Sequence, residues 1–353
     1  MYQSLEKGSE CLAENFSSKN VTKCLEYVYD QTYYEETIAT KFNLVCDKEY
    51  LKNILRTLLI LGLLFGSLIG GRIGDQIGRK KAAFLAYLVM APTLIINGFV
   101  NSFEAYATLH FIYSCTSPIV WINGLVYLTE FYSPSWRYAF TAAISIPIGA
   151  WTLNLIAYLS HTYTMIHMCA GIIAACLLPI YFFVPESPRW LAQNKREKEA
   201  LKIILDMAET NSRPITDVAQ RDIENIVQGI ANEDIKKTLN LLDLFKHGQW
   251  KKTVILSFMW IGLCVSYYGL SLNATDLSGD IFTNFALSRL TTVFQMPLIL
   301  GTSIYFGLKW SIACIQILLG TFLIMLAFIP KENTTGVLIV YLTALLFSGA
   351  SKI

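Results

Sequence analysis

The sequence is poor in charged residues. They make up 15% of its 353 residues, against roughly 25% in ordinary soluble domains. The 28 Lys and Arg nearly balance the 26 Asp and Glu, so the basic excess that holds nucleic-acid phosphates is missing. Disorder is excluded as well, because disordered chains contain few aromatic residues and this chain has 13%.

Motifs for several kinds of chemistry are also missing. The sequence contains no G-x-x-x-x-G-K-[ST] loop, so an ATP-driven pump has no support. Its four histidines show no metal-binding spacing with carboxylates or cysteines, and no nucleophile–base pattern is found. We therefore expect no enzyme and no metal or cofactor, and neither nucleic acid nor ATP as a partner.

Long apolar runs dominate what is present. A helix that crosses hydrocarbon needs about 20 mostly apolar residues. Eight runs satisfy this and a ninth is shorter, which leaves too little polar sequence to wrap them as buried helices of a soluble protein. We predict an all-α, multi-pass membrane protein in the lipid bilayer. The predicted spans are Asn53–Gly70, Ala82–Val100, Ala105–Thr129, Tyr138–Ser160, Met165–Val184, Thr253–Leu272, Ile281–Phe306, Trp310–Ile329 and Gly336–Gly349.

The basic residues of the short loops orient these spans. Residues 72–81 contain four Lys or Arg, the next loop none, and the third Arg137. Because Lys and Arg concentrate on the cytosolic side, the basic loop 185–252 is predicted to be cytosolic and residues 1–50 to lie outside.

Residues 1–50 are polar, and no signal peptide precedes them. Sequons and disulfides are usable only outside the cytosol, and the number of cysteines there is odd. We expect the chain to be a fragment that lacks an upstream span and at least one cysteine. Because the sequence ends at Ile353 inside an apolar run, we expect it to be a fragment at this terminus as well. The candidates are Asn15 and Asn20 for glycosylation, and Cys11, Cys24 and Cys46 for disulfides.

Glycines cluster at the end of the first span. This end of the span has no side chains at four positions, which lets another helix approach closely in a membrane. The four glycines are Gly66, Gly70, Gly71 and Gly74. We expect Asp75 to accept backbone N–H groups at a neighbouring helix N-terminus. The bases at 79–81 would anchor the loop at cytosolic headgroups.

A second informative string follows the fifth span. In Pro185-Glu186-Ser187-Pro188-Arg189-Trp190-Leu191, Pro185 ends the membrane helix, Ser187 suits an N-cap and Pro188 suits the first turn. The apolar spacing from Leu191 to Ala208 predicts one amphipathic cytosolic helix, and the repeats at Ile223, Ile226, Val227 and Ile230 predict a second.

These strings resemble a known family. Residues 71–80 are similar to the major facilitator superfamily signature G-x-x-x-D-x-x-G-R-[RK]. The string P-E-S-P-R-W-L is shared by sugar porters and by the organic ion (cation, anion and carnitine) transporters of that superfamily. Three features resemble the organic ion transporters, namely the cysteine-bearing stretch Cys24–Asp47, the sequence Tyr267–Asn273 and the sequence Leu277–Phe285.

The resemblance implies the major facilitator fold, in which two pseudo-symmetric six-helix bundles rock about a central site. The spans would be helices two to ten of twelve, and the resemblance implies a protein of the plasma membrane. The implied divisions are a partial extracellular loop (1–50), an N-terminal bundle (51–184), a cytosolic helical loop (185–252) and a partial C-terminal bundle (253–353).

The resemblance also implies a cytosolic gate around Asp75 that holds the outward-open state. The acid ending helix four and the arginine opening helix five join it in the family. The predicted gate residues are Gly71, Gly74, Asp75, Gly78, Arg79, Lys80, Glu130, Arg137, Glu186 and Arg189.

Candidate substrate residues lie inside the spans. Tyr267 and Tyr268 offer aromatic faces for an organic cation, although neighbours on a helix point about 100° apart, so only one should face the cavity. Trp121 is at the family's cavity-lining tryptophan position, with Thr129 two turns below. Arg289 lies about 12 Å into its span, where an ionisable residue indicates function by default; the acid of the family's E-x-P pattern is missing nearby.

The sequence leaves three functions open. The first is a secondary transporter of small organic ions, cations or zwitterions such as carnitine, working by rocking-bundle alternating access. The second is an organic anion exchanger that uses Arg289. The third is a truncated product that does not transport.

Overall fold

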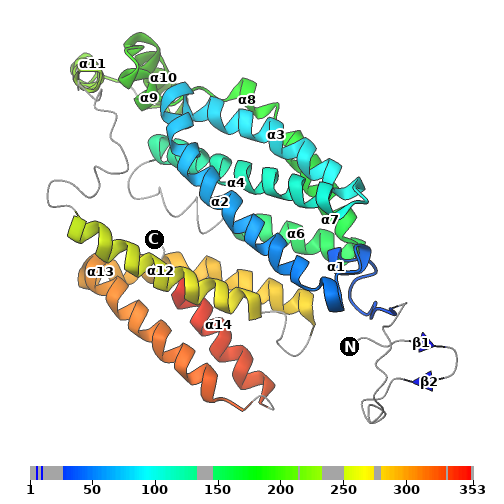
Figure 1. Ribbon diagram of the computed structural model, residues 1–353. Helices are drawn as coiled ribbons and strands as arrows, with labels where there is room; N and C mark the ends of the chain where they lie inside the picture. Colours follow the sequence, from blue (N-terminus) through cyan, green and yellow to red (C-terminus); the bar gives the residue numbers. More distant parts are fainter. Residues whose placement is uncertain are drawn as a thin grey trace.

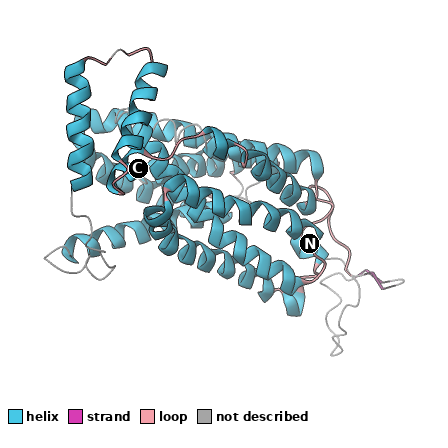
Figure 2. Cartoon of the chain, turned by 90° about the horizontal axis from the view of Figure 1, so that it is seen from above, coloured by secondary structure: helices cyan, strands magenta, loops and turns pink. Residues whose placement is uncertain are grey.

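The computed structural model describes residues 5–6, 9–10, 27–132, 146–213, 215–232, 250–273, 280–330 and 333–350. Two strands form a short antiparallel hairpin, and the remaining elements of the described chain are helical (Figure 2). The elements are β1 (Leu5–Glu6), β2 (Ser9–Glu10), α1 (Ile38–Lys41), η2 (Cys46–Lys48), α2 (Tyr50–Ile77), α3 (Arg79–Phe99), α4 (Phe103–Phe131), α6 (Ile146–Ser160), α7 (Tyr163–Leu177), α8 (Ile180–Phe183), α9 (Pro188–Gln193), α10 (Glu197–Thr210), α11 (Asp217–Asn232), α12 (Trp250–Asn273), α13 (Ile281–Phe328) and α14 (Thr334–Ala350).

Over the described residues each predicted apolar run is helical, and Met165–Val184 is divided between α7 and α8. Within the described residues, seven helical stretches are long and apolar enough to cross a membrane, and α6 and α14 are shorter apolar helices. The first part of the predicted span Tyr138–Ser160 lies outside the described residues. The predicted spans Ile281–Phe306 and Trp310–Ile329 form one run, α13, which bends at Gly307. Gly307 has φ 73° and ψ 156°, a backbone conformation that glycine adopts without steric cost.

The first half of the molecule is built from α2, α3, α4, α6 and α7 (Figure 1). Within α2 a glycine occurs at every fourth position, and all four face inward: Gly62, Gly66, Gly70 and Gly74 are buried. A Cβ on Gly66 would lie 2.0 Å from the carbonyl oxygen of Cys115 on α4. The two backbones therefore meet at a distance that only glycine permits.

This stripe corrects the sequence prediction at two positions. Gly71, predicted to allow close approach, has nothing within 4 Å of the place where its Cβ would be. Gly62, which the prediction omitted, would meet Ser114 at 2.4 Å. The period of four residues, close to one helical turn, is what keeps the stripe on one face of α2.

The second half consists of α12, α13 and α14, which lie together in the lower part of Figure 1. Its buried core joins all three helices through Leu263, Leu270, Leu319, Tyr341, Ala344 and Leu345. Gln295 packs against Gly349, where a Cβ would lie 2.0 Å from its side-chain amide.

The described part of the polar segment between the halves forms the three helices α9, α10 and α11. Ser187 is the N-cap of α9 and Pro188 lies in its first turn, as predicted. The predicted single helix from Leu191 to Ala208 is wrong, because Lys195, with φ 60°, separates α9 from α10. Val227 is buried with Trp190 and Leu191, whereas Ile226, predicted to lie on the apolar face of the second helix, is 62% exposed.

Candidate functional site

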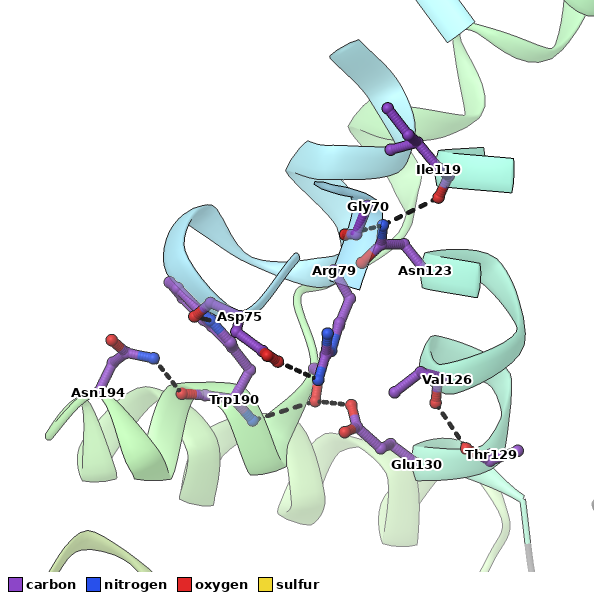
Figure 3. Close-up of polar contacts among 11 residues, drawn as sticks. Gly70, Asp75, Arg79, Ile119, Asn123, Val126, Thr129, Glu130, Trp190 and Asn194 are labelled. Carbon is purple, nitrogen blue, oxygen red and sulfur yellow. Dashed lines mark hydrogen bonds and ion pairs between the residues drawn. The ribbon is translucent and has the colours of Figure 1, made fainter. Parts of the chain in front are cut away.

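We call residues 75–79, where α2 ends and α3 begins, the Asp75 loop. Gly78, with φ 105° and ψ 149°, is the single residue between the two helices. The Asp75 carboxylate pairs with the Arg79 guanidinium across this turn at 2.6 Å. The Asp75 side chain is 65% exposed and that of Arg79 only 15%. In Figure 3 the Arg79 side chain runs from the turn toward the junction of α4 and α9, so its charge is placed among the helix ends.

The acid at the N-terminus of α3 is Glu186. Its Oε1 accepts hydrogen bonds from the backbone N–H groups of Lys80 and Ser187, both at 3.0 Å. Lys80 is in the first turn of α3, where unpaired N–H groups favour a carboxylate. A Cβ on Gly78 would come within 2.5 Å of Glu186 Oε2, so the glycine also makes room for the cap.

The role predicted for Asp75 is therefore wrong in part. Glu186, not Asp75, accepts backbone N–H groups at a helix N-terminus. The carboxylate of Asp75 binds Arg79 instead, and its backbone carbonyl accepts a hydrogen bond from the Trp190 indole at 2.8 Å. Sequence spacing did not show that the P-E-S-P-R-W string folds back onto this loop.

A second junction ties α9 to α4. The hydroxyl of Ser187, which is fully buried, donates to the Glu130 carboxylate and accepts from the Trp190 backbone N–H at 3.1 Å (Figure 3). The Tyr127 hydroxyl donates to the Pro185 carbonyl at 2.8 Å. Glu130 thus belongs to the same junction as Glu186 and Trp190, while Arg137 lies outside the described residues.

Two further bases of the predicted gate have different surroundings. The Lys80 ammonium lies 4.1 Å from the centre of the Tyr181 ring, a cation–π arrangement. Arg189 is exposed on α9.

Asn123 is a member of this region that the sequence prediction missed. It is fully buried, and its side-chain amide donates to the carbonyls of Gly70 and Ile119, both at 2.9 Å (Figure 3). A Cβ on Gly74 would lie 1.7 Å from its Oδ1. The signal that could have found it is an amide inside an otherwise apolar run.

A second polar group lies within the other half. The Arg289 guanidinium donates to the Tyr267 hydroxyl at 3.2 Å and lies 4.8 Å from the centre of the Phe285 ring. Tyr267 also packs against the core around the buried Tyr341. No Asp or Glu occurs in α12, α13 or α14, so these three helices give Arg289 no acidic partner.

The other candidate substrate residues have separate positions. Tyr268 is 46% exposed and Trp121 is 49% exposed. Thr129 donates to the Val126 carbonyl within its own helix at 2.7 Å. The structure thus brings Arg289 and Tyr267 together, whereas Trp121 and Thr129 lie on α4 in the first half.

The predicted modification sites fall mostly outside the described residues. This holds for Asn15, Asn20, Cys11 and Cys24. Cys46 is exposed and carries a free thiol.

The chain matches the family described as "Sugar (and other) transporter" over residues 9–350. The chain belongs to this family. That assignment confirms the prediction of a membrane transporter family and not a family of enzymes, and it fits the multi-pass arrangement of apolar helices.

Relatives of this chain carry names from the predicted branch. It is 29% identical over 308 residues to human solute carrier family 22 member 13, covering 84% of this chain and 53% of that protein. It is 28% identical over 314 residues to human organic cation/carnitine transporter 2, covering 88% and 56%. Bovine solute carrier family 22 member 1 is also 28% identical, over 328 residues that cover 91% of this chain and 56% of that one. The chain therefore spans about half the length of these curated relatives.

Solved structures support the major facilitator fold. The xylose transporter XylE from E. coli, in a partially occluded inward-open conformation, matches with a TM-score of 0.60 and 15% identity. The match covers 87% of this chain and 75% of XylE. A second XylE structure, with bound 6-bromo-6-deoxy-D-glucose, gives a TM-score of 0.57 at 16% identity, covering 88% of this chain and 80% of that one. At this identity the likeness concerns the fold.

Proposed function

We propose that the protein is a secondary transporter of small organic ions that works by rocking two helical bundles against each other. The family match and the names of the relatives support this class. In this proposal residues 1–50 lie outside the cell, 51–184 and 253–353 contribute to the two bundles, and 185–252 lie in the cytosol.

Within that class, Arg289 favours a substrate that carries a carboxylate. The guanidinium lies beside Tyr267 and Phe285 on helices without an acid. A simple cation at 4 Å from it would meet a repulsion of about 4 kcal/mol at an effective dielectric constant of 20. A zwitterion such as carnitine places its carboxylate near Arg289 and its ammonium group over a tyrosine face.

The same observation supports a second candidate, an organic anion exchanger in which Arg289 is the countercharge. The two candidates share the carboxylate and differ in whether the substrate also needs a positive charge. Comparing carnitine with p-aminohippurate separates them.

The proposed cytosolic gate comprises two contacts at the Asp75 end. The first is the Asp75–Arg79 pair at the end of α2. The second is the Glu130–Ser187 hydrogen bond between α4 and the start of α9. Both contacts lie at helix ends of the first half, next to α9 at the start of the segment that joins the two halves. The gate proposal therefore assigns them to fixing the position of that segment in one conformation.

Uptake by the membrane-embedded protein tests the substrate proposal. We expect uptake of labelled carnitine, at least about a hundredfold loss in Arg289→Gln, as for a broken charged pair of about 3 kcal/mol, and partial retention in Arg289→Lys. Lys252→Gln is the matched control, since it removes one exposed positive charge from the start of α12.

Other results would change the proposal. Uptake of p-aminohippurate without carnitine selects the anion exchanger, and uptake of tetraethylammonium that Arg289→Gln leaves unchanged rejects the role of Arg289. A protein that reaches the membrane and carries none of these probes contradicts organic ion transport.

A further inference from the structure

The two halves meet at the end opposite to Asp75, around the start of α13. Phe282 is 94% buried there, since only 6% of its surface is exposed. Four rings surround it, at centroid distances of 6.4 Å for Tyr33, 5.5 Å for Tyr34, 5.4 Å for Tyr158 and 6.0 Å for His161. We name these five residues the Phe282 clasp.

Three separate parts of the chain supply the clasp. Tyr33 and Tyr34 come from the segment before α1, Tyr158 and His161 from the end of α6, and Phe282 from α13 of the other half. Edge-to-face packing is the favoured geometry of aromatic rings, and the rings of Tyr158 and His161 stand at 85° and 80° to that of Phe282.

The segment before α1 is itself fixed to the first half. Glu36 and Thr162 form a parallel β-bridge. The Glu35 N–H donates to the His161 carbonyl at 2.9 Å, and the Tyr163 N–H donates to the Glu36 carbonyl at 3.0 Å. The Tyr33 carbonyl accepts from His161 Nδ1 at 2.8 Å. The four rings around Phe282, which we call the cage, are thus fixed to α6 and α7. Phe282 comes from the other half and inserts between them.

Two hydrogen bonds extend the contact deeper along α13. Asn154 donates its side-chain amide to the Phe282 carbonyl at 3.1 Å, and the Trp151 indole donates to the Ala286 carbonyl at 3.2 Å. Both acceptors are backbone carbonyls in the first turns of α13. Their side-chain donors on α6 can leave without breaking either helix, as a reversible contact between moving parts requires.

We propose that the Phe282 clasp is the extracellular latch of the transporter, which holds the outer end closed and opens when Phe282 leaves the cage. The proposal rests on the alternating access of the proposed function, because a rigid protein would need no latch. It assigns the segment before α1 a specific task, since Tyr33 and Tyr34 close the cage from the loop side.

A labelling experiment tests the latch without any substrate. Ala286→Cys places a thiol one turn below Phe282 on the same helix, and a membrane-impermeant maleimide is added from outside to the protein in intact cells. Labelling is measured against the same protein without Ala286→Cys, which accounts for the native cysteines.

Adding Phe282→Ala should raise the labelling rate of the Ala286→Cys thiol about tenfold, the change expected when one or two aromatic contacts are lost from a two-state equilibrium. Tyr34→Ala should raise it in the same direction, and it tests the clasp from a residue outside the helical bundles should Phe282→Ala not fold. Phe294→Ala, the same substitution at a residue of α13 that is 57% exposed, should leave the rate unchanged.

Equal labelling of all four proteins overturns the latch, because Phe282 would then only pack in a fixed interface. This outcome is distinct from failure of the proposed function, which is read from uptake. A labelling increase in a protein that carries no probe solute keeps the latch and rejects the substrate class.

Discussion

Helix α2 of the first half and helices α12 and α13 of the second half use glycine in different ways. In α2 the four buried glycines face α4, and a Cβ on any of them would come within 3.1 Å of it. In α12 and α13 nothing lies within 4 Å of the Cβ positions at Gly262, Gly269, Gly301, Gly307 and Gly320. The pair α2–α4 therefore depends on close backbone contact along its length, whereas these glycines of α12 and α13 leave room around their helices.

The halves also differ in where they place polar side chains. In the first half the Asp75 loop gathers its acids and bases at the ends of helices. The second half places Arg289 and Tyr267 inside its apolar helices. The first half therefore joins its helices through charged contacts at their ends, whereas the second half holds a guanidinium inside its apolar helices.

The largest effect should come from breaking the glycine stripe. Gly66→Ala puts a methyl group 2.0 Å from the Cys115 carbonyl oxygen and 2.5 Å from Pro118, so α2 and α4 must separate. Overpacking of this kind costs about 1–3 kcal/mol or more. We expect a clear fall in the thermal midpoint of the detergent-solubilised protein, and reduced recovery of folded protein.

Two alanine variants sharpen this test. Gly71→Ala, on the open side of the same helix, and Gly301→Ala, in the second half, meet no neighbour and remove a flexible glycine from a helix. Each should keep or slightly raise the midpoint. A Gly301→Ala variant as unstable as Gly66→Ala would mean that the halves do not differ in how closely their helices pack.

The sequence was sufficient for the helices but not for their contacts. Runs of about 20 apolar residues predict spans because the bilayer fixes their length. The N-cap at Ser187 was also predictable, since capping depends on neighbouring residues. These features are local, and the structure agrees with them.

What the sequence did not show depends on contacts between distant residues. Glu186 caps a helix that begins more than a hundred positions earlier, and Phe282 enters a cage made partly by Tyr33 and Tyr34. The hydrophobic periodicity of a sequence indicates helices and their faces, but it does not predict which distant residues make contact. The difference between Gly71 and Gly74 was hidden for the same reason, because only the position of α4 decides which glycine faces a neighbour.

An intermediate effect is expected at the junction of α3 and α9. Glu186→Ala removes the acceptor of two backbone N–H groups, and loss of a helix cap costs about 1–2 kcal/mol. The free energy of unfolding in detergent should fall by that amount, and Glu186→Gln should restore part of it because its carbonyl oxygen can still accept.

Glu49→Ala is the matched control for that cap. Glu49 is the N-cap residue of α2, but unlike Glu186 it makes no capping hydrogen bond with its side chain, which is 68% exposed beside Lys52. Its removal should change stability by less than about 0.5 kcal/mol. An equal loss in both variants would show that Glu186 acts through general charge rather than through the cap.

The smallest effect concerns the N-caps of α4 and α13, which differ in charge. Asp280 accepts from the Thr283 hydroxyl at 2.6 Å and from its backbone N–H at 2.9 Å, and these hydrogen bonds lower the pKa of the Asp280 carboxyl. The corresponding cap of α4 is the neutral Ser102, which accepts from the Ala105 N–H at 3.4 Å.

The direction of the pH effect follows from the lowered pKa. A carboxyl whose pKa is lower in the folded state stabilises it above the unfolded pKa, about 3.9 for Asp, and loses that contribution as the pH falls through the folded value. Asp280→Ala should therefore lower the thermal midpoint slightly at pH 7, and the difference from the parent should shrink below about pH 4. Ser102→Ala carries no titrating cap and should show a difference of similar size at both pH values. If the Asp280 difference also persisted at low pH, its cap would act as a neutral acceptor like Ser102, and the charge contrast between these two helix starts would have no effect on stability.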